Sequence, residues 1–308
     1  MSVQPLPVIL SRPHGGMQTP SEIAHNLAIT KQDLYNDCDL WVDELYDFSH
    51  SDLANSAPTT AAPNGGPGVL AVTQMPIARA LIDVNRPLSA LGHPDGPIKS
   101  QTSYGKTIYK TPLSSAVEQQ LIKRYWQPYH DHLAQTLYEH AGQVKLVIDC
   151  HNMAQRGPSA YADAGRARPL ICIANMGDAD GAVKPEYGWT LCPSTFARQA
   201  VEIAAELFGD LPLLEPDAER PAPAALLNVP FGRSYILAHC LSPEAAATFQ
   251  RETGHTLPPG IMIEVNRGLL VGDQSSETEM APPNEARIRE IRRRLYQWVG
   301  RVLELLDE

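Results

Sequence analysis

The chain has 308 residues, with 25 Lys or Arg against 35 Asp or Glu, which gives a formal net charge of −10. An acidic chain without a basic tract is poorly suited to nucleic acid or to an anionic membrane, so we expect neither as its main partner. At 43% hydrophobic residues it can bury a large core. Its 27 prolines argue against a helical bundle or a coiled coil.

No apolar run approaches the roughly 18 residues that a membrane span needs. The first residues also lack the basic and apolar segments of a signal peptide. The five cysteines are scattered, odd in number and without a CxxC pair: Cys38, Cys150, Cys172, Cys192 and Cys240. This pattern favours reduced thiols over a disulfide framework or a cysteine-bound zinc, and we expect a cytoplasmic protein.

Short runs rich in Val, Ile and Leu predict strands, and longer amphipathic segments predict helices. In chain order they are a strand at 7–10, a strand at 81–84, a helix from Ser115 to about Ala141 with a break or kink at Pro128, strands at 144–148 and 170–174, a helix from Pro193 to about Phe208 capped by Ser194, a strand at 261–265, and a helix from Asn284 to about Leu306. Residues 54–68 and 211–223 are rich in turn formers and are predicted to be surface loops.

This alternation predicts a three-layer α/β fold with a mixed or mainly parallel sheet. No internal repeat or domain boundary is evident, so we expect residues 1–308 to form one domain. Ligands of such sheets bind at the carboxyl ends of the strands. Polar residues at those ends are therefore the candidates for a functional site.

Two histidines follow predicted strands. His14 comes after the strand at 7–10 and precedes two glycines, which let backbone approach a metal or a substrate closely. Taken alone, His14 is more commonly explained as a solvent-facing loop histidine. His151 follows the strand at 144–148, and Asp149 leaves the same face of an extended segment. Asp149 could orient a metal-bound His151, or both residues could cap the next turn.

Glu264 is an isolated carboxylate in an apolar strand, where burial is costly unless the group is paired or functional. Desolvation would raise its pKa toward the range of a general base. A structural ion pair with Arg267 is the alternative interpretation.

A second polar group lies around the predicted strand at 81–84. Arg79, Asn85 and Arg86 offer guanidinium forks and an amide that suit carboxylate binding or oxyanion stabilisation. Asp83 could pair with one of the arginines, and these residues alone slightly favour a purely structural ion-pair network. Taken with the two histidines and Glu264, these residues match the composition of a mononuclear zinc amidohydrolase site.

The sequence resembles the N-formylglutamate amidohydrolases, relatives of the zinc carboxypeptidases and aspartoacylases. Five segments carry the resemblance, in the same order along the chain: Pro13–Gly16, Asp39–Asp47, Ala78–Pro87, Asp149–Asn152 and Gly260–Arg267. The resemblance implies a three-layer fold like that of the zinc carboxypeptidases. It also implies hydrolysis of the amide bond in an N-formyl- or N-acyl-amino acid.

The resemblance further implies a role for each matching residue. One zinc ion would be held by His14, His151 and a third carboxylate ligand, for which Asp39 is the candidate, with Asp149 as the partner of His151. Glu264 would be the general base and Arg79 would stabilise the oxyanion. Asn85 and Arg86 would hold a substrate carboxylate.

The segment Arg233–His239 departs from the family pattern. It keeps Tyr235 and His239, which are expected near the substrate, but has Ala238 where the family carries an arginine. Arg233 or Arg267 could replace that arginine in substrate binding. A carboxypeptidase- or amidase-like hydrolase of a peptide or cell-wall fragment, and an inactive relative that binds an acidic metabolite, are the alternative functions. The sequence gives no indication of oligomeric state.

Overall fold

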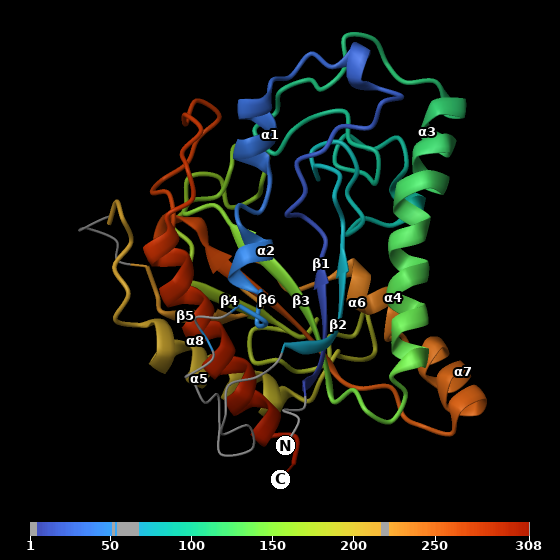
Figure 1. Ribbon diagram of the computed structural model, residues 1–308, viewed down its shortest axis with the longest axis vertical. Coiled ribbons are helices and arrows are strands. Elements are labelled where there is room, and N and C mark those ends of the chain that lie inside the picture. The colour runs from blue at the N-terminus through green and yellow to red at the C-terminus, as the bar shows by residue number, and fades with distance from the viewer. Residues whose placement is uncertain (1–4, 51–52, 54–67, 217–221, 308) are drawn as a thin grey trace.

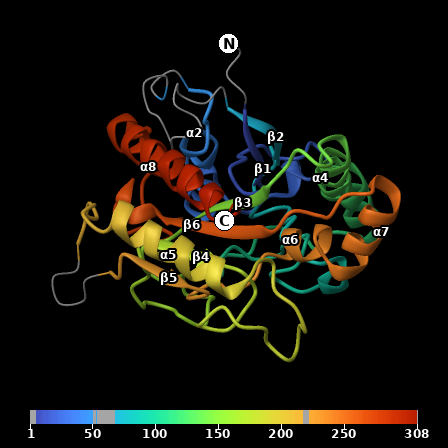
Figure 2. The same cartoon turned by 90° about the horizontal axis from the view of Figure 1, so that it is seen from below.

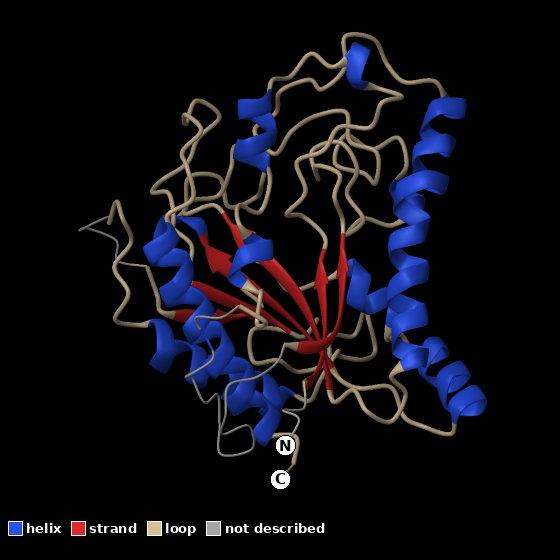
Figure 3. Cartoon of the chain, viewed as in Figure 1, coloured by secondary structure: helices blue, strands red, loops and turns tan. Residues whose placement is uncertain are grey.

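A six-stranded mixed sheet runs through the middle of the computed structural model, which describes residues 5–50, 53, 68–216 and 222–307 (Figures 1 and 3). The strands lie in the order β2 (Val69–Gln74), β1 (Leu6–Arg12), β3 (Leu146–Met153), β6 (Gly260–Asn266), β4 (Ile171–Ala174) and β5 (Ala225–Leu227). Neighbouring strands are parallel except β6 and β4, which are antiparallel.

Helices cover both faces of the sheet (Figure 2). On one face lie α2 (Val42–Leu45), α5 (Ser194–Phe208) and α8 (Glu285–Glu304). On the other lie α4 (Gln127–Glu139), α6 (Tyr235–Cys240) and, outside them, α7 (Pro243–Thr253). The predicted three-layer α/β fold with a mainly parallel sheet is confirmed.

Strand alternation divides the core between the two faces. Val8 and Leu10 pack into the apolar cluster under α5 and α8, while Ile9 packs into the cluster under α4 and α6. In β3, Ile148 and Cys150 belong to the first cluster. Because successive side chains point to opposite faces, Asp149 and His151 face the α4 and α6 side.

The remaining helical segments are short. They are a 3₁₀ turn at Ala24–Asn26, α1 (Lys31–Asp37), a 3₁₀ turn at Leu88–Ala90, α3 (Ser115–Leu121), a π-helical turn at Ile122–Trp126 and a 3₁₀ turn at Arg267–Leu269. The loops gather at one end of the sheet, beyond the carboxyl ends of β1 and β3 (Figure 3). In the described parts of the chain, no helix has both the length and the apolar character needed to cross a membrane.

Two local predictions are wrong, and one predicted strand has other bounds. Residues 81–84 form turns rather than a strand, since the amides of Leu81 and Ile82 both donate to the carbonyl of Ala78. Their apolar side chains are buried by a loop that packs into the core. Ser194 does not cap α5, because Pro193 occupies the N-cap position and no side chain accepts a hydrogen bond there. The strand predicted at 144–148 begins at Leu146 and continues to Met153, so Asp149 and His151 lie within it.

Pro128 does not interrupt the helical segment that begins at Ser115. It follows the π-helical turn Ile122–Trp126 almost directly, and the changed hydrogen-bond pattern of that turn accommodates a residue that has no amide hydrogen to donate. The predicted loop at 211–223 is irregular where it is described, outside 217–221. The predicted loop at 54–68 lies, apart from Gly68, outside the described residues.

Candidate metal centre and active site

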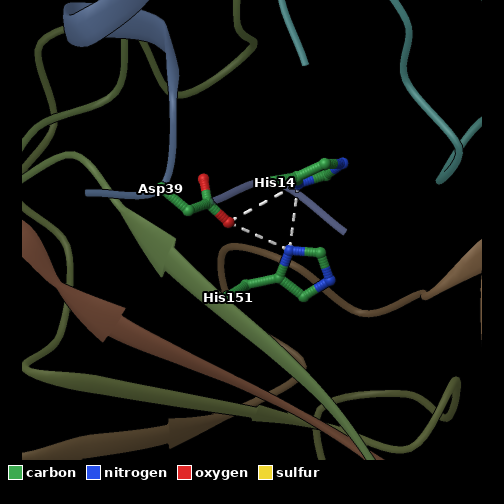
Figure 4. Close-up of side chains that lie close together, drawn as sticks. All are labelled: His14, Asp39 and His151. Carbon is green, nitrogen blue, oxygen red and sulfur yellow. Dashed lines mark hydrogen bonds and ion pairs between the residues drawn. The ribbon is translucent and has the colours of Figure 1, made fainter. Parts of the chain in front are cut away.

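Three buried side chains from distant parts of the chain converge at the carboxyl end of the sheet (Figure 4). His14 follows β1, Asp39 follows α1, and His151 projects from β3. Nδ1 of His151 lies 3.1 Å from Nδ1 of His14 and 3.1 Å from Oδ2 of Asp39, and Nδ1 of His14 lies 3.5 Å from the same oxygen. Among the described residues, this is the one group of His, Cys, Asp or Glu side chains arranged to share a metal ion.

Each histidine is oriented through its other ring nitrogen. Nε2 of His14 lies 2.8 Å from Oδ1 of Asp83, and Nε2 of His151 lies 2.8 Å from Oδ2 of Asp149. An ionised carboxylate can only accept, so both Nε2 atoms carry hydrogen. In the neutral rings both Nδ1 lone pairs then face each other and the Asp39 oxygen.

This arrangement fits zinc. Two imidazole lone pairs and an anionic oxygen repel one another unless a cation lies between them. A tetrahedral zinc ion with bonds of roughly 2.0–2.1 Å holds its ligand atoms about 3.3 Å apart, close to the three separations seen here. Asp83 and Asp149 complete the carboxylate–histidine pairs that are usual around such an ion.

The charges around the centre shift two pKa values in opposite directions. Burial opposes ionisation of Asp39, but the neighbouring His14 and His151, when protonated, and the charge of Arg79 outweigh it, so the pKa of Asp39 lies below its usual range. Burial also disfavours charge on His151, yet the carboxylate of Asp149 raises the pKa of that ring well above its ordinary value. A more basic imidazole is a stronger metal ligand once it has lost its proton.

The loop that carries His14 depends on two glycines. A Cβ on Gly16 would lie 2.3 Å from the backbone carbonyl carbon of Pro76, and one on Gly15 would lie 2.5 Å from Cγ1 of Val42. Both contacts are too short for any side chain. The carbonyl of His14 then accepts a hydrogen bond from the amide of Asp39, which fixes the third candidate ligand beside the first.

Glu264 lies next to His151 in the sheet. The two residues are register partners on the parallel strands β3 and β6, and neighbouring strands place such Cα atoms about 4.8 Å apart. Glu264 is 7% exposed, and burial raises its pKa to about 7 against the opposing effect of His151. A carboxyl group with this pKa can accept and return a proton near neutral pH.

A cavity of about 70 Å³ opens beside these residues, which is room for several water molecules. Its lining includes His14, His151 and Glu264, together with five arginines: Arg79, Arg86, Arg168, Arg233 and Arg267. These arginines outnumber the acidic residues of the lining, Asp37 and Glu264, although the chain as a whole is acidic. That balance suits a small anionic ligand.

Four of the five arginines are committed to contacts within the protein. Arg79 lies 3.5 Å from Asp39 and 3.4 Å from Asp83, and Arg86 lies 2.8 Å from Asp95. Arg168 forms a bidentate pair with Asp163. Arg267 donates to the backbone carbonyls of Asn36 and Cys38 and so supports the loop that carries Asp39.

Arg233 differs from the other four. It is exposed and its guanidinium lies 5.1 Å from the ring centre of Tyr187, and within the described chain no acidic side chain pairs with it. Its hydrogen-bond donors are therefore available to a ligand.

The predicted substrate-binding residues are not all brought together. Asn85, Arg86 and Arg267 line the cavity, whereas Tyr235 and His239 do not. These two rings stack on each other with centroids 5.6 Å apart, and His239 lines a separate cavity of about 410 Å³ between α4, α6 and α7. Ala238 packs against the apolar cluster under α4 and α6.

Sequence reasoning missed several residues of the site. Asp83 was expected to pair with an arginine, and it does, but its contact with His14 was not foreseen. Arg168, Tyr161 and Phe231 also line the cavity, and the guanidinium of Arg168 lies 4.8 Å from the ring centre of Phe231. An arginine two residues before a predicted buried strand was the available signal for Arg168. Tyr161 and Phe231 lie in irregular segments that carry no such signal.

Comparisons with known proteins place the chain in a family. The family model for N-formylglutamate amidohydrolase matches residues 6–271. A solved N-formylglutamate amidohydrolase from Ralstonia eutropha JMP134 is similar in fold, with 18% identity, a TM-score of 0.63, and coverage of 99% of this chain and 95% of that chain. A gene product of Agrobacterium tumefaciens is also similar, with 18% identity, a TM-score of 0.59, and coverage of 98% and 92%.

At these identities the two structures support the fold alone, and no curated protein matches the sequence. The family model carries more weight because it covers most of the 308 residues. The chain therefore belongs to the N-formylglutamate amidohydrolase family.

Proposed function

We propose that this protein is a zinc-dependent hydrolase, in one catalytic domain, that cleaves the amide bond of a small carboxylate-bearing N-acyl amino acid, with N-formylglutamate as the first candidate. The observation that carries the proposal is the convergence of two Nδ1 lone pairs and the Asp39 carboxylate beside Glu264 and an arginine-lined cavity. Membership of an amidohydrolase family supports the same reaction.

His14, Asp39 and His151 would hold the ion. Zinc bound there supplies a Lewis acid that polarises a carbonyl group and lowers the pKa of water. Glu264 accepts a proton from the attacking water and then delivers it to the nitrogen of the leaving amine. Its pKa of about 7 suits both transfers.

Arg79 stabilises the negative charge that develops on the carbonyl oxygen, since it lines the cavity and is held between Asp39 and Asp83. Arg86, held by Asp95, binds a substrate carboxylate with its remaining donor capacity. Arg233 is the candidate for a second carboxylate, because in the described chain it has no acidic partner and, unlike Arg267, is not held by backbone carbonyls. The small cavity favours a formyl or acetyl group over a long acyl chain.

Metal analysis joined to an activity screen tests the proposal. We expect about one zinc per chain and release of the free amino acid from N-formyl-glutamate, with slower cleavage as the acyl group lengthens. Removal of zinc with a chelator should abolish turnover, and zinc should restore it. Stoichiometric zinc without turnover on any N-formyl-, N-acetyl- or longer N-acyl amino acid would contradict the proposed reaction and favour a binding protein.

A further inference from the structure

A chain of buried hydroxyl groups leads from α4 to the partner of His151. Oδ1 of Asp149 accepts a hydrogen bond of 2.5 Å from Oγ of Ser11, and Oδ2 accepts one of 2.6 Å from Oγ of Ser234. Oγ of Ser11 also lies 2.7 Å from the hydroxyl of Tyr129. Ser11, Asp149 and Ser234 have no solvent exposure, and Tyr129 is 4% exposed.

The direction of these hydrogen bonds follows from the donor count. Ser11 has one hydroxyl hydrogen and gives it to the carboxylate of Asp149, so the hydroxyl of Tyr129 must donate to the Ser11 oxygen. Ser234 likewise donates to Asp149, while its oxygen accepts from the amide of Leu237 and so caps α6. Every donor in this network points toward Asp149.

The two histidine partners are held in different ways. Asp83 lies 3.4 Å from Arg79 and 3.8 Å from Arg86, so guanidinium charges fix it. Within the described chain no Lys or Arg pairs with Asp149. The hydroxyl groups of Ser11 and Ser234 donate hydrogen bonds to it instead. The orientation of His151 therefore depends on neutral donors from β1, α4 and the start of α6.

We propose that Ser11, Ser234 and Tyr129 are positioning residues that set the metal affinity of the centre by holding Asp149 against Nε2 of His151. Loss of a donor lets the carboxylate turn, so the ring is no longer fixed with Nδ1 toward the ion. Because β1, α4 and α6 all contribute, the packing of two helices is linked to the metal centre. This inference rests on the metal site proposed above.

Metal binding by purified protein tests this, with zinc affinity measured by competition against a chromophoric chelator at fixed pH. We expect Ser11→Ala and Ser234→Ala each to raise the zinc Kd by about 10-fold or more, within the range known for such partners. Tyr129→Phe should raise it by a few-fold, because Tyr129 acts through Ser11. The visible spectrum of the cobalt-loaded protein should change in the same variants.

The control is Ser242→Ala, which removes the hydroxyl that caps α7 and so imitates the loss of a helix cap without touching Asp149. Its zinc Kd should equal that of the wild type. In an Asp149→Asn background, Ser11→Ala and Ser234→Ala should have no further effect, since residues that act through one group are not additive.

Unchanged zinc affinity and an unchanged cobalt spectrum in both serine variants would overturn the inference while leaving the metal site intact. Full additivity with Asp149→Asn would overturn it as well, because the serines would then act independently of Asp149. A wild-type protein that binds no zinc would overturn the metal centre itself, and the inference with it.

Discussion

At the scale of single residues, the proposed site would assign metal binding and proton transfer to different side chains. The three candidate ligands each have a fixed neighbour that orients them, whereas Glu264 lies beside them on β6 and is absent from the group that could share an ion. Substitutions at Glu264 should therefore affect the reaction without affecting the metal.

The Glu264→Gln variant should bind zinc as the wild type does but have a much lower kcat. The amide is close in size to the carboxylate but cannot accept a proton, so we expect kcat to fall by roughly 100- to 10 000-fold. Steady-state kinetics with metal analysis of the same sample measures both properties. Glu252→Gln, an exposed change on α7, is the matched control. A variant at Glu264 with wild-type kcat would show that the base lies elsewhere.

Arg233→Gln should weaken binding of a substrate that carries a side-chain carboxylate. A hydrogen bond to a charged group contributes about 1.5–3 kcal/mol, which corresponds to roughly a 10- to 100-fold preference for an N-acyl-glutamate over the matching N-acyl-glutamine. We expect the ratio of the two kcat/KM values to fall toward 1 in this variant and to persist in Arg251→Gln, an exposed change on α7. Persistence of the preference in Arg233→Gln would assign the second carboxylate to another residue.

Sequence reasoning found the site residues that stand next to apolar strands. His14, His151 and Glu264 are recognisable because a polar residue is conspicuous beside a buried run. It could not find contacts that only the fold creates. The partner of His14 is 69 residues away, and Tyr129 is 118 residues from Ser11.

At the scale of elements, strands with dense apolar runs were predictable, and buried loops were not. Residues 81–84 have the composition of a strand, yet they form turns with one isolated antiparallel bridge, between Ile82 and Ile98, and do not join the sheet. Conversely, β2 and β5 were not predicted although both begin with apolar residues. β5 has only three residues, and both strands lie at the edges of the sheet, where several of their residues are only partly buried. The start of α6 was also missed, although it supplies Ser234.

Asn85 supports a whole element, because it holds the start of α6 in place. Its Oδ1 accepts hydrogen bonds from the amides of Tyr235, at 2.7 Å, and Ile236, at 3.1 Å. Asn85 therefore supports α6 in addition to any role in substrate binding.

Asn85→Ala should lower the free energy of unfolding by about 1–3 kcal/mol, because two amides at the start of α6 lose their acceptor. Urea denaturation measures this directly. If Asn85 also binds substrate, KM for the proposed substrate should rise. Wild-type stability with a raised KM would mean that substrate binding, and not support of α6, is the main role of Asn85.

At the scale of the whole molecule, the sheet brings the site together. Parallel alignment of β1, β3 and β6 places His14, His151 and Glu264 at one end, although they lie up to 250 residues apart in the sequence. The net charge of −10 belongs to the whole chain, while the cavity collects arginines that Asp83, Asp95 and Asp163 partly neutralise. Composition could predict the net charge of the chain but not the arginines gathered in the cavity.

Because the candidate ligands come from separate regions, they meet only in the folded state, and zinc should therefore stabilise the whole fold. A ligand that binds only the native state at a concentration of 1,000 times its Kd adds about 4 kcal/mol to the free energy of unfolding. We expect thermal unfolding of chelator-treated protein to shift to higher temperature when zinc is added. His151→Ala should remove most of this shift, whereas His132→Ala, which lies on α4 away from the centre, should keep it. An equal shift in His151→Ala would mean that the ion binds at some other place.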